Sequence, residues 1–155
     1  MRLFLLGTLL YLSGNSWAQT YQVGQTYFDT NQYIEYQLGN ILLIIVVPHG
    51  GYLEPTNIPD RNCTGCSYIR DAYTQELGRI LAQMLADNIS LTGVCRPHLI
   101  INRLHRKKLD ANRALTTATD GAPQAEAAWY VFHNFVEVAR ATCRNYTVYS
   151  VLPIR

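Results

Sequence analysis

Charge is scarce in this 155-residue sequence. Asp, Glu, Lys and Arg together make up 15% of the residues, and the formal net charge is only +2. So small a net charge excludes a protein that binds polyanions by bulk electrostatics, and any preference for anions must come from a local arrangement of side chains. The hydrophobic fraction of 48% indicates one globular domain rather than a disordered chain.

A long apolar run is also missing at the N-terminus. The apolar stretch from Leu3 to Leu12 is too short to span a bilayer comfortably. It follows the positive charge of Arg2 and precedes Ser16-Trp17-Ala18, which fits a small-x-small cleavage site. This pattern predicts a secretory signal peptide over residues 1–18. We expect a secreted, extracellular protein that begins at Gln19 and has no membrane anchor after cleavage.

Cysteine is limited to four residues, and no second short-spaced pair follows Cys63-x-x-Cys66, which argues against a zinc knuckle. In an oxidising compartment the four are best explained as two disulfides, with three connectivities open, among Cys63, Cys66, Cys95 and Cys143. Three N-glycosylation sequons fit the same route and predict a glycoprotein, at Asn62, Asn88 and Asn145.

The hydrophobic pattern predicts an α/β domain. Residues 26–37 have the composition of short strands, and residues 41–47 form an unbroken apolar run that is typical of a central strand buried on both faces. Residues 71–88 predict an amphipathic helix with Asp71 at its N-cap and an apolar stripe made of Tyr73, Leu77, Ile80, Leu81, Met84 and Leu85. A short apolar strand at residues 99–101, a second helix at 124–143 and strand-like residues at 147–152 follow. We therefore expect a mostly parallel sheet with flanking helices.

The two apolar strands and the helix between them form a β-α-β unit. Their parallel carboxyl ends should lie side by side, because sequential parallel strands of this kind are usually neighbours. His49, in the loop Pro48-His49-Gly50-Gly51, would then lie beside the stretch from Arg103 to Arg113. The two glycines would allow the backbone to approach whatever the histidine holds.

The stretch from Arg103 to Arg113 contains six basic or titratable groups in eleven residues. Such runs are usually solvated surface, and some bind heparin or nucleic acid. The end of this run differs, because Asp110 and Asn112 stand where a polyanion-binding segment would have more cations. Asp110 lies four residues after Arg106 and three before Arg113, so it can hold both guanidinium groups toward one small anion. We expect a pocket for a small carboxylate, with no nucleic-acid partner.

Taken together, Pro48-His49-Gly50-Gly51 after an apolar strand, Ile58-Pro59, and Arg106-x3-Asp110-x-Asn112-Arg113 resemble the N-formylglutamate amidohydrolase family, specifically its secreted branch. The resemblance covers about residues 41–142, and the Arg-x3-Asp-x-Asn-Arg element is its specific part. It implies an α/β fold of the zinc-peptidase/phosphorylase-hydrolase kind, similar to the zinc carboxypeptidases. It also implies zinc-dependent hydrolysis of the amide of a small N-acyl amino acid or similar carboxylate.

The resemblance also implies roles for individual residues. His49 would be a zinc ligand, and Asn112 with Arg113 would clamp the substrate carboxylate. Arg106 would share that clamp or polarise the scissile carbonyl as a catalytic group. Zinc would acidify a bound water while a bidentate arginine fixes the amide.

The sequence departs from the family pattern in two places. The carboxypeptidase-like enzymes have a histidine and a glutamate two residues apart on this loop, whereas the second ligand here stays open among Glu54, Asp60 and Asp71. Members of the family also continue into a further strand and an Asp-x-His-Gly segment with another expected ligand, and the given sequence stops before it. Residues 19–155 are therefore expected to be the first part of a single amidohydrolase-like domain. Two functions remain open, a secreted zinc amidohydrolase and a non-catalytic secreted protein that retains an anion-binding site.

Overall fold

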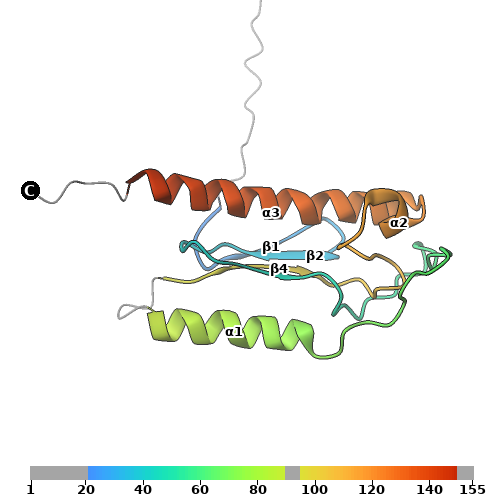
Figure 1. Ribbon diagram of the computed structural model, residues 1–155, viewed down its shortest axis with the longest axis horizontal. Helices are drawn as coiled ribbons and strands as arrows, with labels where there is room; N and C mark the ends of the chain where they lie inside the picture. The colour runs from blue at the N-terminus through green and yellow to red at the C-terminus, as the bar shows by residue number, and fades with distance from the viewer. Residues whose placement is uncertain (1–20, 90–94, 150–155) are drawn as a thin grey trace, which may run out of the picture.

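The computed structural model describes residues 21–89 and 95–149, which form three layers (Figure 1). A four-stranded sheet lies in the middle, with the long helix α3 and the short helix α2 on one face and helix α1 on the other. The elements in chain order are β1 (Thr26–Phe28), β2 (Ile34–Gln37), β3 (Ile44–Val47), α1 (Thr74–Ile89), β4 (His98–Asn102), α2 (Leu115–Thr119) and α3 (Pro123–Tyr149). The predicted signal peptide lies outside the described residues.

The sheet is mixed, with the strand order β1-β2-β4-β3. β3 and β4 are parallel, whereas β1 pairs with β2 and β2 pairs with β4 in antiparallel fashion. The expectation of a mostly parallel sheet is therefore wrong. The N-terminal strand material forms a hairpin, and its second strand inserts beside β4 on the side away from β3. The expected parallel pairing of the two apolar strands is confirmed.

The apolar run at residues 41–47 does not form the central strand that was expected. β4 is central, and all five of its residues are buried. β3, predicted as the central strand, lies at the end of the sheet, and Val46 is 41% exposed. The apolar run thus predicted a strand correctly but not its position in the sheet. A strand at the edge, paired on one side with the buried strand β4, can also consist of aliphatic residues. Among the described residues, no strand pairs with the outer edge of β3.

The larger part of the core lies between the sheet and α3. Ile34 and Tyr36 of β2 and Ile100 of β4 meet a helix face made of Ala125, Ala128, Phe132, Phe135 and Ala139. These five helical residues fall at spacings of three and four, which places them on one face of the helix. Helix α3 nevertheless runs on to Tyr149, so the part of the predicted strand at residues 147–149 is helical; residues 150–152 are outside the described chain.

Helix α1 packs on the other face of the sheet through its small residues. Gln75, Gly78, Ala82 and Ala86 are its buried positions. The apolar stripe expected to face the core points away instead, with exposed fractions of 61% for Leu77, 56% for Ile80 and 56% for Met84. Asp71 is not an N-cap, because the helix begins at Thr74. A bidentate ion pair from Arg79 to the buried Glu35 of β2 fixes this orientation.

In the chain that the structure describes, no helix combines the length and apolar character needed to cross a membrane.

The orientation of α1 predicts opposite effects for two kinds of substitution. Ala82→Leu should lower the free energy of unfolding by about 1–3 kcal/mol, because the larger side chain has no room against Val47 and Leu99. Met84→Gln should change it by less than about 0.5 kcal/mol, because Met84 is exposed. Urea unfolding followed by circular dichroism measures both. The reverse ranking would show that the stripe faces the core after all.

Candidate functional site

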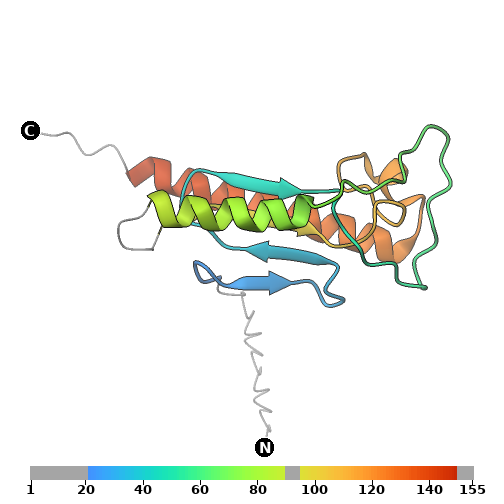
Figure 2. The ribbon, with the colours of Figure 1, turned by 90° about the horizontal axis from the view of Figure 1, so that it is seen from below.

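The loops that follow β3 and β4 gather at one end of the sheet, beyond the carboxyl ends of both strands (Figure 2). Asn102, the last residue of β4, connects the two loops. Its buried side-chain amide donates hydrogen bonds to the carbonyl oxygens of Pro48 at 2.9 Å and Leu109 at 3.3 Å. Backbone hydrogen bonds continue the contact, from Leu53 N–H to the Arg103 oxygen and from His105 N–H to the Leu53 oxygen.

The two glycines after His49, expected to let the backbone approach a ligand, lie against other parts of the chain. A Cβ on Gly51 would overlap the backbone of Arg103 and Leu104, and one on Gly50 would overlap the side chain of Thr74. They allow close packing of the chain on itself, rather than an approach to a ligand held by His49.

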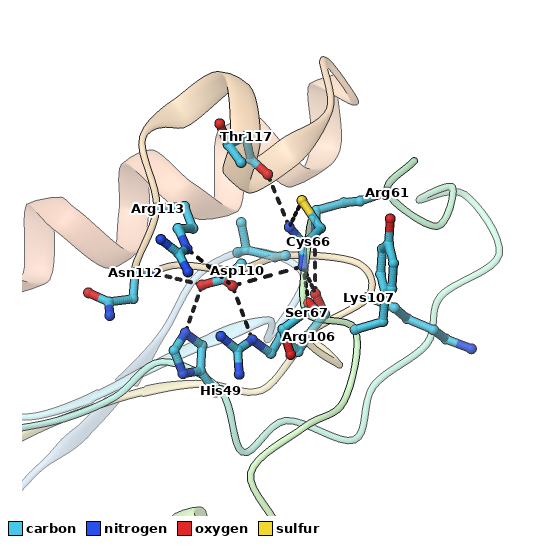
Figure 3. Close-up of polar contacts among 12 residues, drawn as sticks. His49, Arg61, Cys66, Ser67, Arg106, Lys107, Asp110, Asn112, Arg113 and Thr117 are labelled. Atoms are coloured by element: carbon cyan, nitrogen blue, oxygen red, sulfur yellow. Dashed lines mark hydrogen bonds and ion pairs between the residues drawn. The ribbon is translucent and has the colours of Figure 1, made fainter. Parts of the chain in front are cut away.

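The buried carboxylate of Asp110 is the centre of the site (Figure 3). Its Oδ1 lies 2.7 Å from His49 Nε2, and its Oδ2 accepts a hydrogen bond from Arg106 Nε at 3.0 Å. Arg61 Nη2 and Arg113 Nε are each 4.0 Å from Oδ2. Asp110 thus contacts both arginines between which the sequence spacing places it.

The electrostatics of this cluster favour an ionised Asp110. Burial alone would raise the pKa of a carboxyl group, but hydrogen bonds from His49 and Arg106 and the charges of these partners outweigh it. The pKa of Asp110 therefore lies well below its usual range. The carboxylate remains charged at any physiological pH and holds its basic partners in fixed positions.

Arg61 is a residue of the Asp110 cluster that sequence reasoning missed. Its guanidinium is buried and donates to the carbonyl oxygens of Arg106 at 2.8 Å, Ser67 at 2.8 Å and Thr117 at 3.0 Å. Burial lowers its pKa from the ordinary arginine value. It joins the loop after β3, the loop after β4 and helix α2. Nothing in the surrounding Ile58-Pro59-Asp60-Arg61 distinguishes it from a surface arginine.

Asn112 and Arg113 face solvent at the rim of the cluster. The Arg113 side chain is 60% exposed, and only its Nε approaches Asp110. The Asn112 side chain points away from Asp110 in Figure 3 and lines an adjacent groove beside His49. Among the side chains and backbone groups that the structure describes, none hydrogen-bonds the Asn112 side-chain amide or the terminal nitrogens of Arg113. Both therefore have donors available for a ligand.

The other cations of the basic run are paired within the protein. Lys107 Nζ lies 2.8 Å from Glu54, and Lys108 Nζ donates to the Ile58 oxygen at 2.6 Å and to Asp60 at 2.7 Å. Arg103 donates to the Gln32 oxygen at 2.8 Å. The run is thus folded back onto acids and carbonyl groups.

Two of the candidate metal ligands come together. His49 Nδ1 lies 3.3 Å from Asp71 Oδ2, whose other oxygen is 3.3 Å from Arg106 Nη1. Glu54 and Asp60 are engaged by Lys107 and Lys108 instead, and Glu54 also lies 3.7 Å from His105. Among the described residues, no group of three His, Cys, Asp or Glu side chains could hold a metal ion. Of the three acids left open as a second ligand, Asp71 is therefore the one that contacts His49, and the metal site stays a prediction.

The remaining histidines take other positions. His98 is fully buried at the start of β4, with its Nδ1 3.0 Å from the Tyr36 hydroxyl, and burial lowers its pKa to about 4. His133 packs against Trp129, with its Nε2 3.2 Å from the Ala111 oxygen. Neither contacts His49.

Of the predicted disulfides, one is present, between Cys63 and Cys66. The only other pairing open to the remaining two, Cys95 with Cys143, is not formed; Cys143 Sγ lies 3.6 Å from the Ile41 oxygen. Of the sequons, Asn62 and Asn88 are exposed, and the side chain of Asn145 lies outside the described structure. Glycosylation stays a prediction.

Comparison of this chain with protein-family models, with curated proteins and with solved structures found no match.

The buried carboxylate predicts a characteristic loss of stability in acid. Because the folded pKa of Asp110 is below the unfolded value of about 3.9, its ionisation stabilises the fold above about pH 4. That stabilisation is lost as the pH falls through the lower folded pKa. Asp110→Asn should cost about 3–5 kcal/mol at neutral pH, because buried arginines lose their counter-charge, and should flatten the dependence of stability on pH below about pH 4.

Urea unfolding at a series of pH values measures both effects. Asp87→Asn is the control, because Asp87 is exposed and contacts only Gln83 within the described chain. It should shift the free energy of unfolding by less than about 0.5 kcal/mol. An Asp110→Asn variant with the wild-type slope in acid would contradict the assignment.

Proposed function

We propose that this protein is secreted and binds the carboxylate of a small N-acyl amino acid, or of a similar amide, at the carboxyl ends of β3 and β4. Arg113 and Asn112 hold the carboxylate, and Arg106 lies beside them. The single observation that carries the proposal is the asymmetry of the arginines around Asp110. Arg106 and Arg61 are fixed by the buried carboxylate and by carbonyl groups, whereas Arg113 keeps its terminal nitrogens in solvent.

The local charge supports an anionic ligand. The guanidinium groups of Arg61, Arg106 and Arg113 surround Asp110, and Asp71 is the only other carboxylate in contact with the cluster in the described chain. Three positive groups thus face two negative ones, which leaves positive charge for a ligand. An arginine with two free parallel N–H groups suits a carboxylate in particular, because the two planar groups match.

The competing interpretation as a polyanion-binding run has less support. A heparin or nucleic-acid site needs several cations that are free to contact phosphates or sulfates. Lys107 and Lys108 are paired with Glu54 and Asp60, so they are not free in this way.

Zinc-dependent hydrolysis is the second candidate, and the His49–Asp71 pair favours it. Ligands bound to zinc at about 2.0–2.1 Å in a tetrahedron lie roughly 3.3 Å apart, which matches the 3.3 Å between His49 Nδ1 and Asp71 Oδ2. The Nε2 of His49 contacts a buried carboxylate, as the second nitrogen of a zinc-bound histidine usually does. The family resemblance points the same way.

The described residues do not, however, complete a catalytic zinc site. Such sites have three protein ligands and an open position for water. Asp110 cannot be the third ligand without giving up its hydrogen bonds to His49 and Arg106. We therefore derive no hydrolytic step from this geometry, and we propose carboxylate binding as the function that these residues perform on their own.

The two candidate ligands found among the described residues predict weak zinc binding by this protein. Two protein ligands should hold zinc far less tightly than three, so dialysis against a chelator should remove the metal readily, with no hydrolysis of N-formylglutamate. Metal analysis and an assay for released formate measure the two outcomes. Tight, stoichiometric zinc with turnover would show that another residue completes the site.

The carboxylate clamp predicts unequal effects for two basic residues. Arg113→Lys should weaken binding of a small N-acyl amino acid by about 1–3 kcal/mol, because lysine cannot form two parallel hydrogen bonds. Lys107→Ala should change it little, because Lys107 is paired with Glu54. Isothermal titration calorimetry distinguishes them. Equal losses, together with heparin binding that falls steeply with salt, would favour the polyanion interpretation.

A further inference from the structure

A groove of about 320 Å³ runs between the edge strand β3 and helix α1 and ends at the candidate site. Sites for small molecules begin at about this volume. Aliphatic side chains and Pro48 line most of it, namely Ile45, Val46, Val47, Leu77 and Leu81. His49, Asp71 and Asn112 line its polar end.

The packing of α1 explains why the groove is apolar and open. Because the helix contacts the sheet through Gly78 and Ala82, its larger side chains remain outside the small core beneath it. Leu77 is 61% exposed, Leu81 is 43% exposed, and Val46 on the neighbouring strand is 41% exposed. Apolar surface left in water at the wall of a groove is stabilised when an apolar ligand covers it.

The groove has a polar end and an apolar remainder. His49, Asp71 and Asn112 line the polar end, and aliphatic side chains line the rest. Arg113, the residue after Asn112, lies outside the lining and has an exposed side chain beside Asp110. An N-acyl amino acid carries both kinds of group, a carboxylate and an amide at one end and an acyl chain at the other. A formyl group would reach only the polar end and would leave the aliphatic walls in water.

We propose that the ligand is an N-acyl amino acid with a medium-length aliphatic acyl chain, and that the groove between β3 and α1 binds this chain. The inference rests on the proposed carboxylate site and names its ligand class. From Ile45 to His49 the backbone spans at most about 14 Å, which sets the length available to the chain. Longer chains would extend beyond the groove into solvent.

A homologous series of ligands tests the proposal directly. The 155-residue protein is titrated calorimetrically with N-acyl-glutamates whose chains are formyl, butanoyl, hexanoyl, octanoyl and decanoyl, each below its micelle concentration. Affinity should rise by about two- to fourfold for each added methylene, as apolar surface is buried, and should level off when the groove is filled. The heat-capacity change should become more negative along the series.

Two neighbouring helix residues provide a matched pair of variants. Leu81 lines the groove, whereas Ile80 is 56% exposed and lies outside it. Leu81→Asp should reduce octanoyl-glutamate affinity by about tenfold or more and leave formyl-glutamate unchanged, because only the chain loses its contacts. Ile80→Asp introduces the same charge into the same helix at a slightly smaller cost in helix propensity, and should reduce octanoyl-glutamate affinity by less than about twofold.

The outcomes separate this inference from the proposed function. If all members of the series bind with equal affinity, and Arg113→Lys weakens that binding, the assignment of the groove to an acyl chain is overturned and the proposed carboxylate site stands. No binding of any member would overturn both. A rise with chain length that Leu81→Asp and Ile80→Asp weaken equally would indicate nonspecific adhesion, and would overturn the groove. A stable dimer that dissociates with Leu81→Asp and excludes the octanoyl ligand would assign the groove to a second copy of the chain.

Discussion

The burial of one carboxylate, that of Asp110, sets the arrangement of the loops around the site. A buried charge is strongly destabilising unless its partners are close and well oriented. Here the partners come from separate parts of the chain, His49 after β3, Arg61 twelve residues further on, and Arg106 after β4. Each segment must reach Asp110 for the charge to be compensated. Correct folding of the loops and assembly of the site are therefore the same event.

The same compensation places the basic residues in different environments. Arg61 and Arg106 donate hydrogen bonds or form ion pairs to Asp110, Asp71 and carbonyl oxygens, and these contacts hold their side chains in place. Arg113 contacts the cluster at its edge and retains its terminal nitrogens for a ligand. A charge count along the sequence treats these three residues as equals. Their burial separates two internal arginines from one whose side chain is exposed, and the proposed carboxylate site depends on this difference.

Sequence reasoning predicted the parts of this arrangement that depend on short spacings. Arg106 and Asp110 are four residues apart, and His49 follows a strand whose parallel neighbour leads to them, so their proximity could be inferred. Arg61 could not, because its burial depends on packing between distant segments. The antiparallel pairing of β2 with β4 could not be predicted either, because the composition of a strand does not determine which strand it pairs with.

Helix α1 shows a further limit, and it bears on function. The sequence of α1 has one face of small residues and another of large apolar ones, and periodicity alone favours the larger face as the buried one. The structure buries the small face, because Gly78 permits close approach to Val47 while Arg79 reaches the buried Glu35. This orientation of α1 leaves only a small core between the helix and the sheet, and it leaves aliphatic side chains exposed beside β3. The apolar groove beside the candidate site is thus a direct consequence of how the helix packs.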